Sequence, residues 1–252
     1  AGRVGGVKAN TQYVGDFYRE NILINNNVLE AARITGVQLL ISTLSSCIYP
    51  HNITPLKERY LHRGEPHQSN FGYAYAKRML DIQSRAYKQQ YGCDFRCVIP
   101  NNCYGPNDNF DLENGHVIPS LIRRIYEAKL NGLESVSIWG DGSALRQFTY
   151  SEDIAEILIF LLGKKWNGPI NIGNTEEVSI KDLVNTLCKI LDYGGQIVWD
   201  TSQPSGQHQK TLCTNKFRSE VPTYHHRFVE LEDGLKKTCE WFISNYPNVR
   251  GI

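Results

Sequence analysis

A tyrosine and a lysine stand four residues apart at Tyr73 and Lys77, in a stretch whose pattern predicts a helix over residues 70–91. Side chains at that spacing lie on one helix face, within reach of a common ligand. An ammonium group beside a phenol favours the phenolate and lowers the tyrosine pKa, so Tyr73 could exchange a proton near neutral pH. The alternative is a solvated pair, because the same spacing also occurs on ordinary helix surfaces.

Ser45 and Cys47 form a second candidate cluster, directly after a mostly apolar run at residues 37–43 that predicts a buried strand. A hydroxyl at a strand end can hold a substrate carbonyl oxygen while Tyr73 protonates it. A thiol near a cation or a histidine is shifted toward thiolate and can take a proton from a carbon next to a ketone. The alternative for any cysteine is a small buried apolar residue, and we assign it to Cys93, Cys97, Cys188 and Cys239.

The elements that must position these residues alternate along the first half of the chain. Apolar spacing predicts a helix over residues 16–34, which is followed by the strand at 37–43, the helix at 70–91 and a strand at 95–100. This alternation is typical of an α/β fold with a doubly wound parallel, Rossmann-like sheet. Ligand sites of that architecture lie at the carboxyl ends of the strands, where Ser45 and Cys47 are expected.

Shorter units follow Pro106. We expect helices near residues 118–130, after Ser151, after Ser179 and over 231–246, and strands at 136–139, 147–150, 169–172 and 197–200. We interpret residues 1–115 as the remainder of a cofactor-binding Rossmann-like domain that carries the catalytic residues. Residues 116–252 are expected to form mostly a smaller, mixed α/β substrate-binding lobe, interleaved with the last strands of the sheet.

Composition excludes several classes of partner. The chain has 27 Lys and Arg against 26 Asp and Glu, so its formal net charge of +1 argues against a nucleic-acid surface. The longest apolar stretch, residues 154–163, is too short to cross a membrane. Seven cysteines without a C-x-x-C pair argue against a disulfide framework and a structural metal site. A reducing cytoplasm is the expected location.

Four ordered segments carry a family resemblance. They are Ser45-Ser46-Cys47-Ile48-Tyr49-Pro50, Asn70-Phe71-Gly72-Tyr73-Ala74-Tyr75-Ala76-Lys77, Tyr104-Gly105-Pro106-Asn107-Asp108-Asn109-Phe110 and Gly115-His116-Val117-Ile118-Pro119. A strand-end serine before a tyrosine-lysine helix resembles the short-chain dehydrogenase/reductases, and the long loop and C-terminal lobe resemble their extended, nucleotide-sugar-modifying branch. Within it the chain is similar to the epimerase-reductases that convert GDP-4-keto-6-deoxymannose to GDP-L-fucose with NADP(H).

The resemblance implies a role for each matching residue. Cys47 and His116 would exchange protons at C3 and C5 of the sugar, Tyr73 would protonate the C4 oxygen, Ser45 would hold that oxygen, and Lys77 would hold Tyr73 and the nicotinamide ribose. Residues implied to contact the cofactor are Lys77, Asn102, Cys103 and His116. Residues implied to contact the GDP-linked substrate are Arg124, Trp139, Arg146 and Lys210, although Arg124 and Lys210 could instead be solvated surface charges.

A homodimer through the helices at 16–34 and 70–91 is also implied by the resemblance.

Two departures from the family pattern change what we expect. The family's glycine-rich turn, G-x-x-G-x-x-G, is absent from this sequence, and residues 1–6 resemble the segment after the family's fourth strand. We therefore expect an N-terminally truncated sheet with one uncovered edge, at residues 37–43. The alternative is a genuinely shortened, noncatalytic protein that binds a nucleotide sugar.

The second departure is Ser205, which stands in Pro204-Ser205-Gly206 where family members commonly have Pro-Asp-Gly. Loss of that carboxylate weakens the expectation of guanine specificity at this position. A related epimerase or reductase that acts on a different nucleotide is the corresponding alternative.

Overall fold

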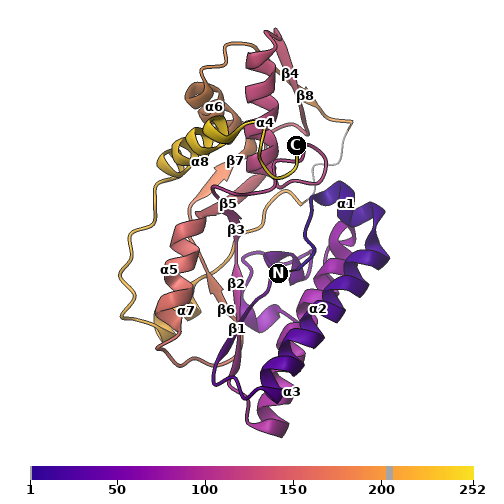
Figure 1. The fold of residues 1–252 in the computed structure, drawn as a ribbon, viewed down its shortest axis with the longest axis vertical. Coiled ribbons are helices and arrows are strands. Elements are labelled where there is room, and N and C mark those ends of the chain that lie inside the picture. Colours follow the sequence, from indigo (N-terminus) through magenta and orange to yellow (C-terminus); the bar gives the residue numbers. More distant parts are fainter. Residues whose placement is uncertain (1, 203–206) are drawn as a thin grey trace.

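The computed structural model describes residues 2–202 and 207–252. Its first sheet is parallel and has the order β1 (Leu40–Thr43), β2 (Phe95–Pro100), β6 (Ile170–Ile172). Within the described residues β1 pairs with β2 alone, so β1 forms one edge of this sheet, as the sequence predicts. Figure 1 shows the three strands crossing the lower half of the molecule.

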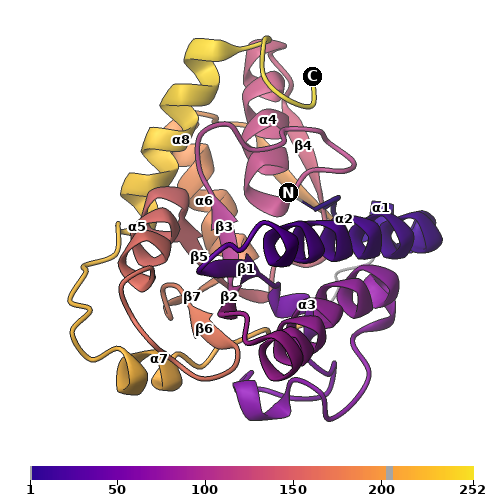
Figure 2. The ribbon, with the colours of Figure 1, turned by 60° about the horizontal axis from the view of Figure 1, so that its bottom comes forward.

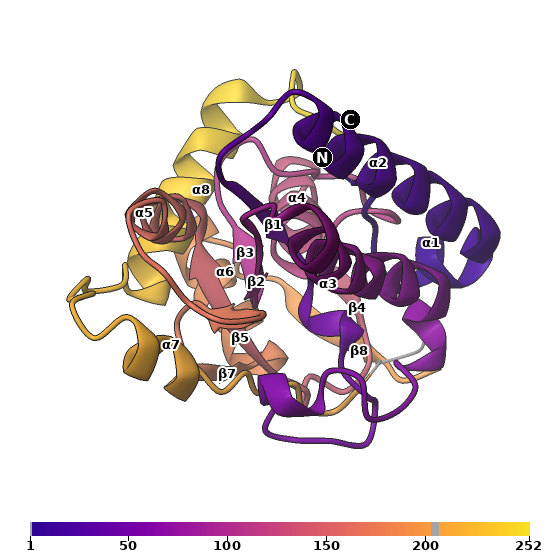
Figure 3. The ribbon, with the colours of Figure 1, turned by 90° about the horizontal axis from the view of Figure 1, so that it is seen from below.

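Helices cover both faces of this sheet (Figure 3). α2 (Val14–Ile34) and α3 (Phe71–Tyr91) lie side by side on one face, and α5 (Ser151–Leu161) and α7 (Asn215–Glu220) lie on the other. Alternation along β2 explains the two cores. Cys97 and Ile99 pack toward α2 and α3, whereas Val98 between them packs toward α5. The predicted doubly wound α/β fold is confirmed.

A second group of elements packs above the sheet in Figures 1 and 2. It contains the sheet β3 (Asn102–Tyr104), β5 (Leu145–Tyr150), β7 (Glu177–Ser179) and the parallel pair β4 (Ser135–Trp139), β8 (Gln196–Asp200). Helices α4 (Val117–Leu130), α6 (Ile180–Leu191) and α8 (Leu231–Asn245) enclose an apolar core with these strands. Phe110 and Phe242 meet at its centre with ring centroids 4.5 Å apart.

Several expectations at element boundaries need correction. β1 begins at Leu40 rather than at residue 37. Ser151 is the first residue of α5, and the N-cap position belongs to Tyr150, which makes no capping side-chain bond. The cap at Ser179 is confirmed, because its hydroxyl accepts the Asp182 amide at 3.0 Å. The sequence did not predict α1 (Val7–Gln12), β3, β7 or α7.

No described helix is long and apolar enough to cross a membrane. In the same described residues, no group of three or more histidine, cysteine, aspartate or glutamate side chains is placed to hold a metal ion.

Candidate active site

Ser45 and Cys47 lie where β1 ends. After Thr43 the chain leaves the sheet and turns into a 3-10 helix over Ser46–Ile48. Ser45 caps this turn, since its hydroxyl oxygen accepts the amide proton of Cys47 at 3.3 Å. Ile48 is fully buried beneath the turn. The serine hydroxyl and the thiol are thus held together at the carboxyl end of a parallel strand, where ligands bind in this type of fold.

Tyr73 reaches the same point from the first turn of α3. Its ring packs edge-on against Phe17 of α2, with ring centroids 6.4 Å apart. Burial raises the pKa of Tyr73 above its ordinary value, and Cys47 acts in the same direction, while a hydrogen bond with Ser45 opposes them. The expectation that Lys77 lowers this pKa is therefore wrong, because desolvation of the phenolate outweighs the nearby charges.

Lys77 lies one turn further along α3 and is only 7% exposed. Its ammonium lies 6.0 Å from the centre of the Tyr73 ring and donates to the carbonyl oxygen of Thr43 at 3.2 Å. Burial lowers the pKa of Lys77. The segment before α1 passes close by, since a Cβ on Gly2 would lie 3.4 Å from the Lys77 amine.

The residues present fit one end of an NADP(H) molecule. The buried Lys77 ammonium has three protons and one hydrogen-bond acceptor among the described residues, which leaves donors for ribose hydroxyls. Asn102 and Cys103 lie on neighbouring β3, where the Asn102 amide donates to the Gln147 carbonyl at 2.8 Å and Cys103 is exposed. The free donors of Lys77 suit ribose hydroxyls, whereas the glycine-rich turn that would suit the pyrophosphate is absent from this sequence.

His116 is exposed and occupies the N-cap position of α4. It lies close to Asp108, whose pKa is raised by burial while His116 opposes that rise. The loop before it is held by the N-terminal segment through the Gly6 amide, which donates to Asn114 at 3.0 Å. No hydrogen bond joins His116 to Cys47 in the described part of the chain, so the two groups could act on a substrate only from separate positions.

Arg146 and Lys210 bring the C-terminal half of the chain to this site. The Lys210 amine lies 3.6 Å from the Cys47 sulfur. The Arg146 guanidinium is half-buried, and it donates to the carbonyl oxygens of Leu145, Gln207 and His208 at 2.7, 2.7 and 3.1 Å. No sequence pattern predicts the contact between Lys210 and the thiol, because the two residues are 163 positions apart.

The two remaining predicted substrate contacts lie in the upper group of elements. Arg124 is half-buried on α4, and Trp139 is 39% exposed at the end of β4. No hydrogen bond or ion pair joins either side chain to the Cys47 cluster among residues 2–202 and 207–252. The departure at Pro204-Ser205-Gly206 lies outside the described residues.

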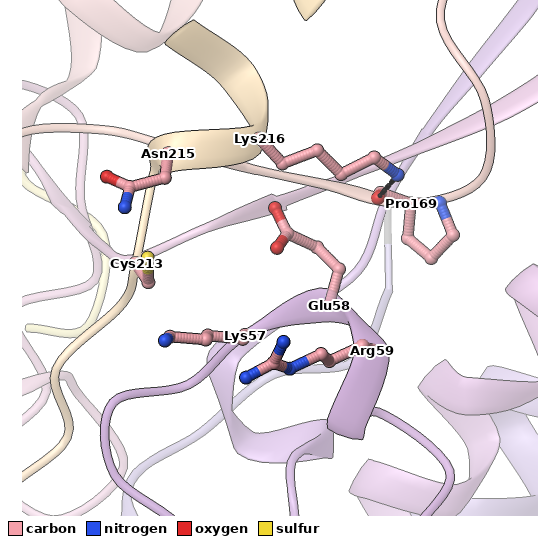
Figure 4. Close-up of a pocket in the computed structure, with 7 residues that line it drawn as sticks. All are labelled: Lys57, Glu58, Arg59, Pro169, Cys213, Asn215 and Lys216. Atoms are coloured by element: carbon pink, nitrogen blue, oxygen red, sulfur yellow. Dashed lines mark hydrogen bonds between the residues drawn. The ribbon is translucent and has the colours of Figure 1, made fainter. Parts of the chain in front are cut away.

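A separate pocket of about 520 Å³ contains none of the predicted site residues. Figure 4 shows Lys57 and Arg59 side by side on one wall, with Lys216 opposite them and donating to the Pro169 carbonyl at 2.8 Å. Glu58 lies between the two walls and accepts the Asn171 amide at 2.8 Å. The proton-transfer groups are therefore not in this pocket.

The sequence pattern of the NAD dependent epimerase/dehydratase family matches residues 1–173. GDP-L-fucose synthase from Dictyostelium discoideum is 42% identical over 254 residues, which cover 99% of this chain and 78% of that protein. A probable GDP-L-fucose synthase from Drosophila melanogaster is 39% identical, with 99% and 80% covered. The crystal structure of a GDP-L-fucose synthetase from Naegleria fowleri bound to NADP superimposes with a TM-score of 0.91 at 39% identity, covering 99% of this chain and 77% of that one.

These matches extend over nearly all of the chain, and they agree with the strand-end serine and the tyrosine-lysine helix. The chain belongs to the NAD dependent epimerase/dehydratase family and, within it, to the group of the GDP-L-fucose synthases.

Proposed function

We propose that this protein catalyses the NADPH-dependent 3,5-epimerisation and 4-reduction of GDP-4-keto-6-deoxy-D-mannose to GDP-L-fucose. The observation that carries the proposal is the meeting of a thiol and a phenol around one serine, at Cys47, Tyr73 and Ser45. Epimerisation needs a base and an acid at carbons next to a ketone, and reduction needs an acid at the ketone oxygen. One site with both sets of groups can serve both reactions.

In the epimerisation, Cys47 and His116 exchange protons with C3 and C5 of the sugar. The ketone at C4 acidifies both carbons, so loss of a proton gives an enolate that is reprotonated from the opposite face. Cys47 follows β1 and His116 stands at the N-cap of α4, so the proposal places the sugar ring between two groups that come from different elements. Each group can then address one face of the ring.

In the reduction, Tyr73 gives a proton to the C4 oxygen while Ser45 donates a hydrogen bond to that oxygen. NADPH, when bound, supplies the hydride. Because burial keeps the pKa of Tyr73 high, the phenol carries its proton at neutral pH and is ready to donate it. Lys77 holds the nicotinamide ribose in this proposal, and Asn102, Cys103 and His116 are the further residues proposed to contact the cofactor.

Charged and aromatic side chains on the upper elements bind the nucleotide. Arg124 and Arg146 offer planar guanidinium donors that suit a diphosphate, Trp139 offers a ring that can stack on the base, and Lys210 reaches the sugar end beside Cys47. Residues 1–115 would then supply the cofactor side with the catalytic residues, and residues 116–252 would supply mostly the substrate side.

We also propose a homodimer through the exposed faces of α2 and α3. These helices expose apolar side chains that the fold does not cover, at Tyr18, Leu23, Val28, Ile34, Ile82 and Tyr91. A reducing compartment, the cytoplasm, suits the chain because all seven of its cysteines are unpaired.

The decisive experiment is turnover of GDP-4-keto-6-deoxymannose with NADPH in deuterium oxide. The wild-type protein should oxidise NADPH and place deuterium at C3 and C5. Tyr73→Phe should place deuterium in the sugar without oxidising NADPH, and Cys47→Ser should lose epimerisation and the deuterium exchange that accompanies it. Wild-type protein that binds the sugar nucleotide without consuming NADPH would instead support a noncatalytic binding protein. Deuterium exchange at the wild-type rate in both Cys47→Ser and His116→Ala would overturn the roles of these two residues.

A further inference from the structure

We propose that Lys210 is a positioning residue whose positive charge stabilises an ionised Cys47 sulfur. Residues 207–213, called the strap below, form an extended segment that holds Lys210 beside this sulfur. The inference rests on the proposed function, because it assigns Cys47 as the base. The Lys210 amine is 3.6 Å from the Cys47 sulfur, within the range of a hydrogen bond to sulfur. Both side chains are half-buried, so water screens their charges only partly.

Side chains of the strap alternate in direction, and this alternation points Lys210 toward the Cys47 thiol. Residues on either side of it point to the opposite face, where the Glu177 carboxylate accepts from the Gln209 amide at 3.0 Å and from the Thr211 hydroxyl at 2.6 Å. Successive side chains of an extended segment point in opposite directions, so Lys210 points away from Glu177. No ion pair with Lys210 occurs among the described residues, which leaves its charge available to the sulfur.

Backbone bonds on both sides hold the strap in place. On one side, the Leu56 amide donates to the Thr211 carbonyl at 2.7 Å. On the other, the Leu145 amide donates to the His208 carbonyl at 2.8 Å, and the Gln147 side chain accepts the Leu212 amide at 2.8 Å. Because the backbone is fixed from two directions, only the lysine side chain must be ordered to reach the thiol.

The remaining groups around the thiol do not replace Lys210. The Arg146 charge is near Cys47 but its guanidinium hydrogen-bonds strap carbonyls. His67 adds no competing positive charge, since burial and the neighbouring Lys210 lower its pKa. The phenol of Tyr73 remains protonated. Among the described residues, the Lys210 ammonium is therefore the cation in hydrogen-bond contact with the sulfur, and the Arg146 charge acts in the same direction from outside that contact.

The proton transfers at Cys47 need no reactant other than solvent and the sugar. The thiol first releases its proton to solvent and becomes a thiolate beside the ammonium. The thiolate then takes a proton from the sugar carbon, which leaves an enolate and restores the thiol. Lys210 keeps all three of its protons throughout, so it acts only through its charge and its hydrogen bond to sulfur.

Alkylation by iodoacetamide tests whether Lys210 stabilises the Cys47 thiolate, and it needs neither substrate nor cofactor. The thiolate is the form of cysteine that reacts with iodoacetamide. The rate at Cys47 is measured at pH 7 by mass spectrometry of its peptide, with half-buried Cys93 in the same sample as internal reference. Lys210→Gln keeps a donor but loses the charge, and should react about 10-fold more slowly at Cys47. Lys210→Arg should react within about threefold of wild type, as should Lys165→Met, which removes an exposed charge elsewhere.

An unchanged rate at Cys47 in Lys210→Gln would overturn the inference. Equal slowing at Cys47 and Cys93 would also overturn it, because the loss of rate would then not be specific to the thiol beside Lys210. If Lys210→Gln fails to fold by circular dichroism, Lys210→Met is measured in its place. The proposed reaction is tested separately, by the turnover assay in deuterium oxide. A slow Cys47 in Lys210→Gln, with no wild-type turnover, would support the counter-charge and reject the reaction.

Discussion

Burial, more than the neighbouring charge, sets the proton chemistry of the tyrosine-lysine pair. The sequence correctly predicted that Tyr73 and Lys77 lie on one helix, but helical spacing cannot show how much water reaches either group. In the structure, desolvation raises the pKa of Tyr73 and lowers the pKa of Lys77, so burial disfavours the charged form of each group. Tyr73 is consequently suited to give a proton rather than to begin as a phenolate.

The lowered pKa of Lys77 predicts that this residue reduces the stability of the fold. Its folded-state pKa is below the unfolded value, so the charged form destabilises the folded state at pH 7. That penalty shrinks as pH rises through the folded-state pKa toward the unfolded one. Lys77→Met should therefore increase the free energy of unfolding at pH 7, and the gain should narrow at pH 10.

Urea unfolding at the two pH values measures this effect. Lys88→Met is the matched control, because Lys88 is exposed near the end of the same helix, and its effect should be small at both pH values. A loss of stability at pH 7 in Lys77→Met would mean that the hydrogen bond to Thr43 outweighs the cost of burying the ammonium.

At the scale of elements, long periodic segments were predictable, whereas several of the shortest, β3 and β7 among them, were not. β2 has the bounds that the sequence predicted, and α3 ends at Tyr91 because Gly92 takes a left-handed conformation with φ of 73°. β3 and β7 have three residues each, which is too few for alternation to appear. β3 nevertheless carries Asn102 and Cys103, so periodicity alone did not show how those two residues are placed.

Close packing of α3 against the start of α2 depends on Gly72, the residue before Tyr73. A Cβ at Gly72 would lie 2.4 Å from the Val14 carbonyl oxygen, whereas a Cβ at Gly15, in α2, would meet nothing within 4 Å. Gly72→Ala should cost about 1–3 kcal/mol through overpacking. Gly15→Ala should instead stabilise by about 0.5–1 kcal/mol, because alanine is the better helix former.

Chemical denaturation compares the two alanine variants directly. Since Gly72 sets the position of Tyr73, NADPH oxidation should also fall in Gly72→Ala and remain at the wild-type level in Gly15→Ala. Equal stability of the two variants would show that α3 can move away from Val14 without cost.

The N-cap of α6 gives a second prediction at this scale. The Ser179 hydroxyl accepts the Asp182 amide at 3.0 Å and donates to the Asp182 carboxylate at 2.6 Å. Ser179→Ala should lower the free energy of unfolding by about 1 kcal/mol, while Ser179→Asn, which can still cap, should lose less. Equal losses in urea unfolding would assign the effect to something other than the cap.

At the scale of the whole molecule, contacts between segments that are distant along the chain could not be predicted from the sequence. The meeting of Ser45, Cys47 and Tyr73 follows from general rules, because strand ends and helix starts of a doubly wound sheet converge at one edge. The approach of Lys210 to Cys47 depends on a strap held between Leu56 and β5, and no local pattern near residue 210 records that arrangement. Burial of Tyr73 and Lys77 likewise depends on α2 and the N-terminal segment that pack over them.

The dimer proposed through α2 and α3 gives a prediction for the whole molecule. Leu23 and Ile34 are 54% and 67% exposed on α2, and they lie eleven positions apart, about three helical turns, so they share one face. In a dimer this face would be buried, and a charge on it would lose its water without gaining a partner. Leu23→Asp with Ile34→Asp should therefore shift the protein from dimer to monomer. Ile159→Asp, at a 68% exposed position on α5, should leave the mass unchanged. Sedimentation equilibrium distinguishes these cases, and a wild-type mass of one chain at all concentrations would reject the dimer.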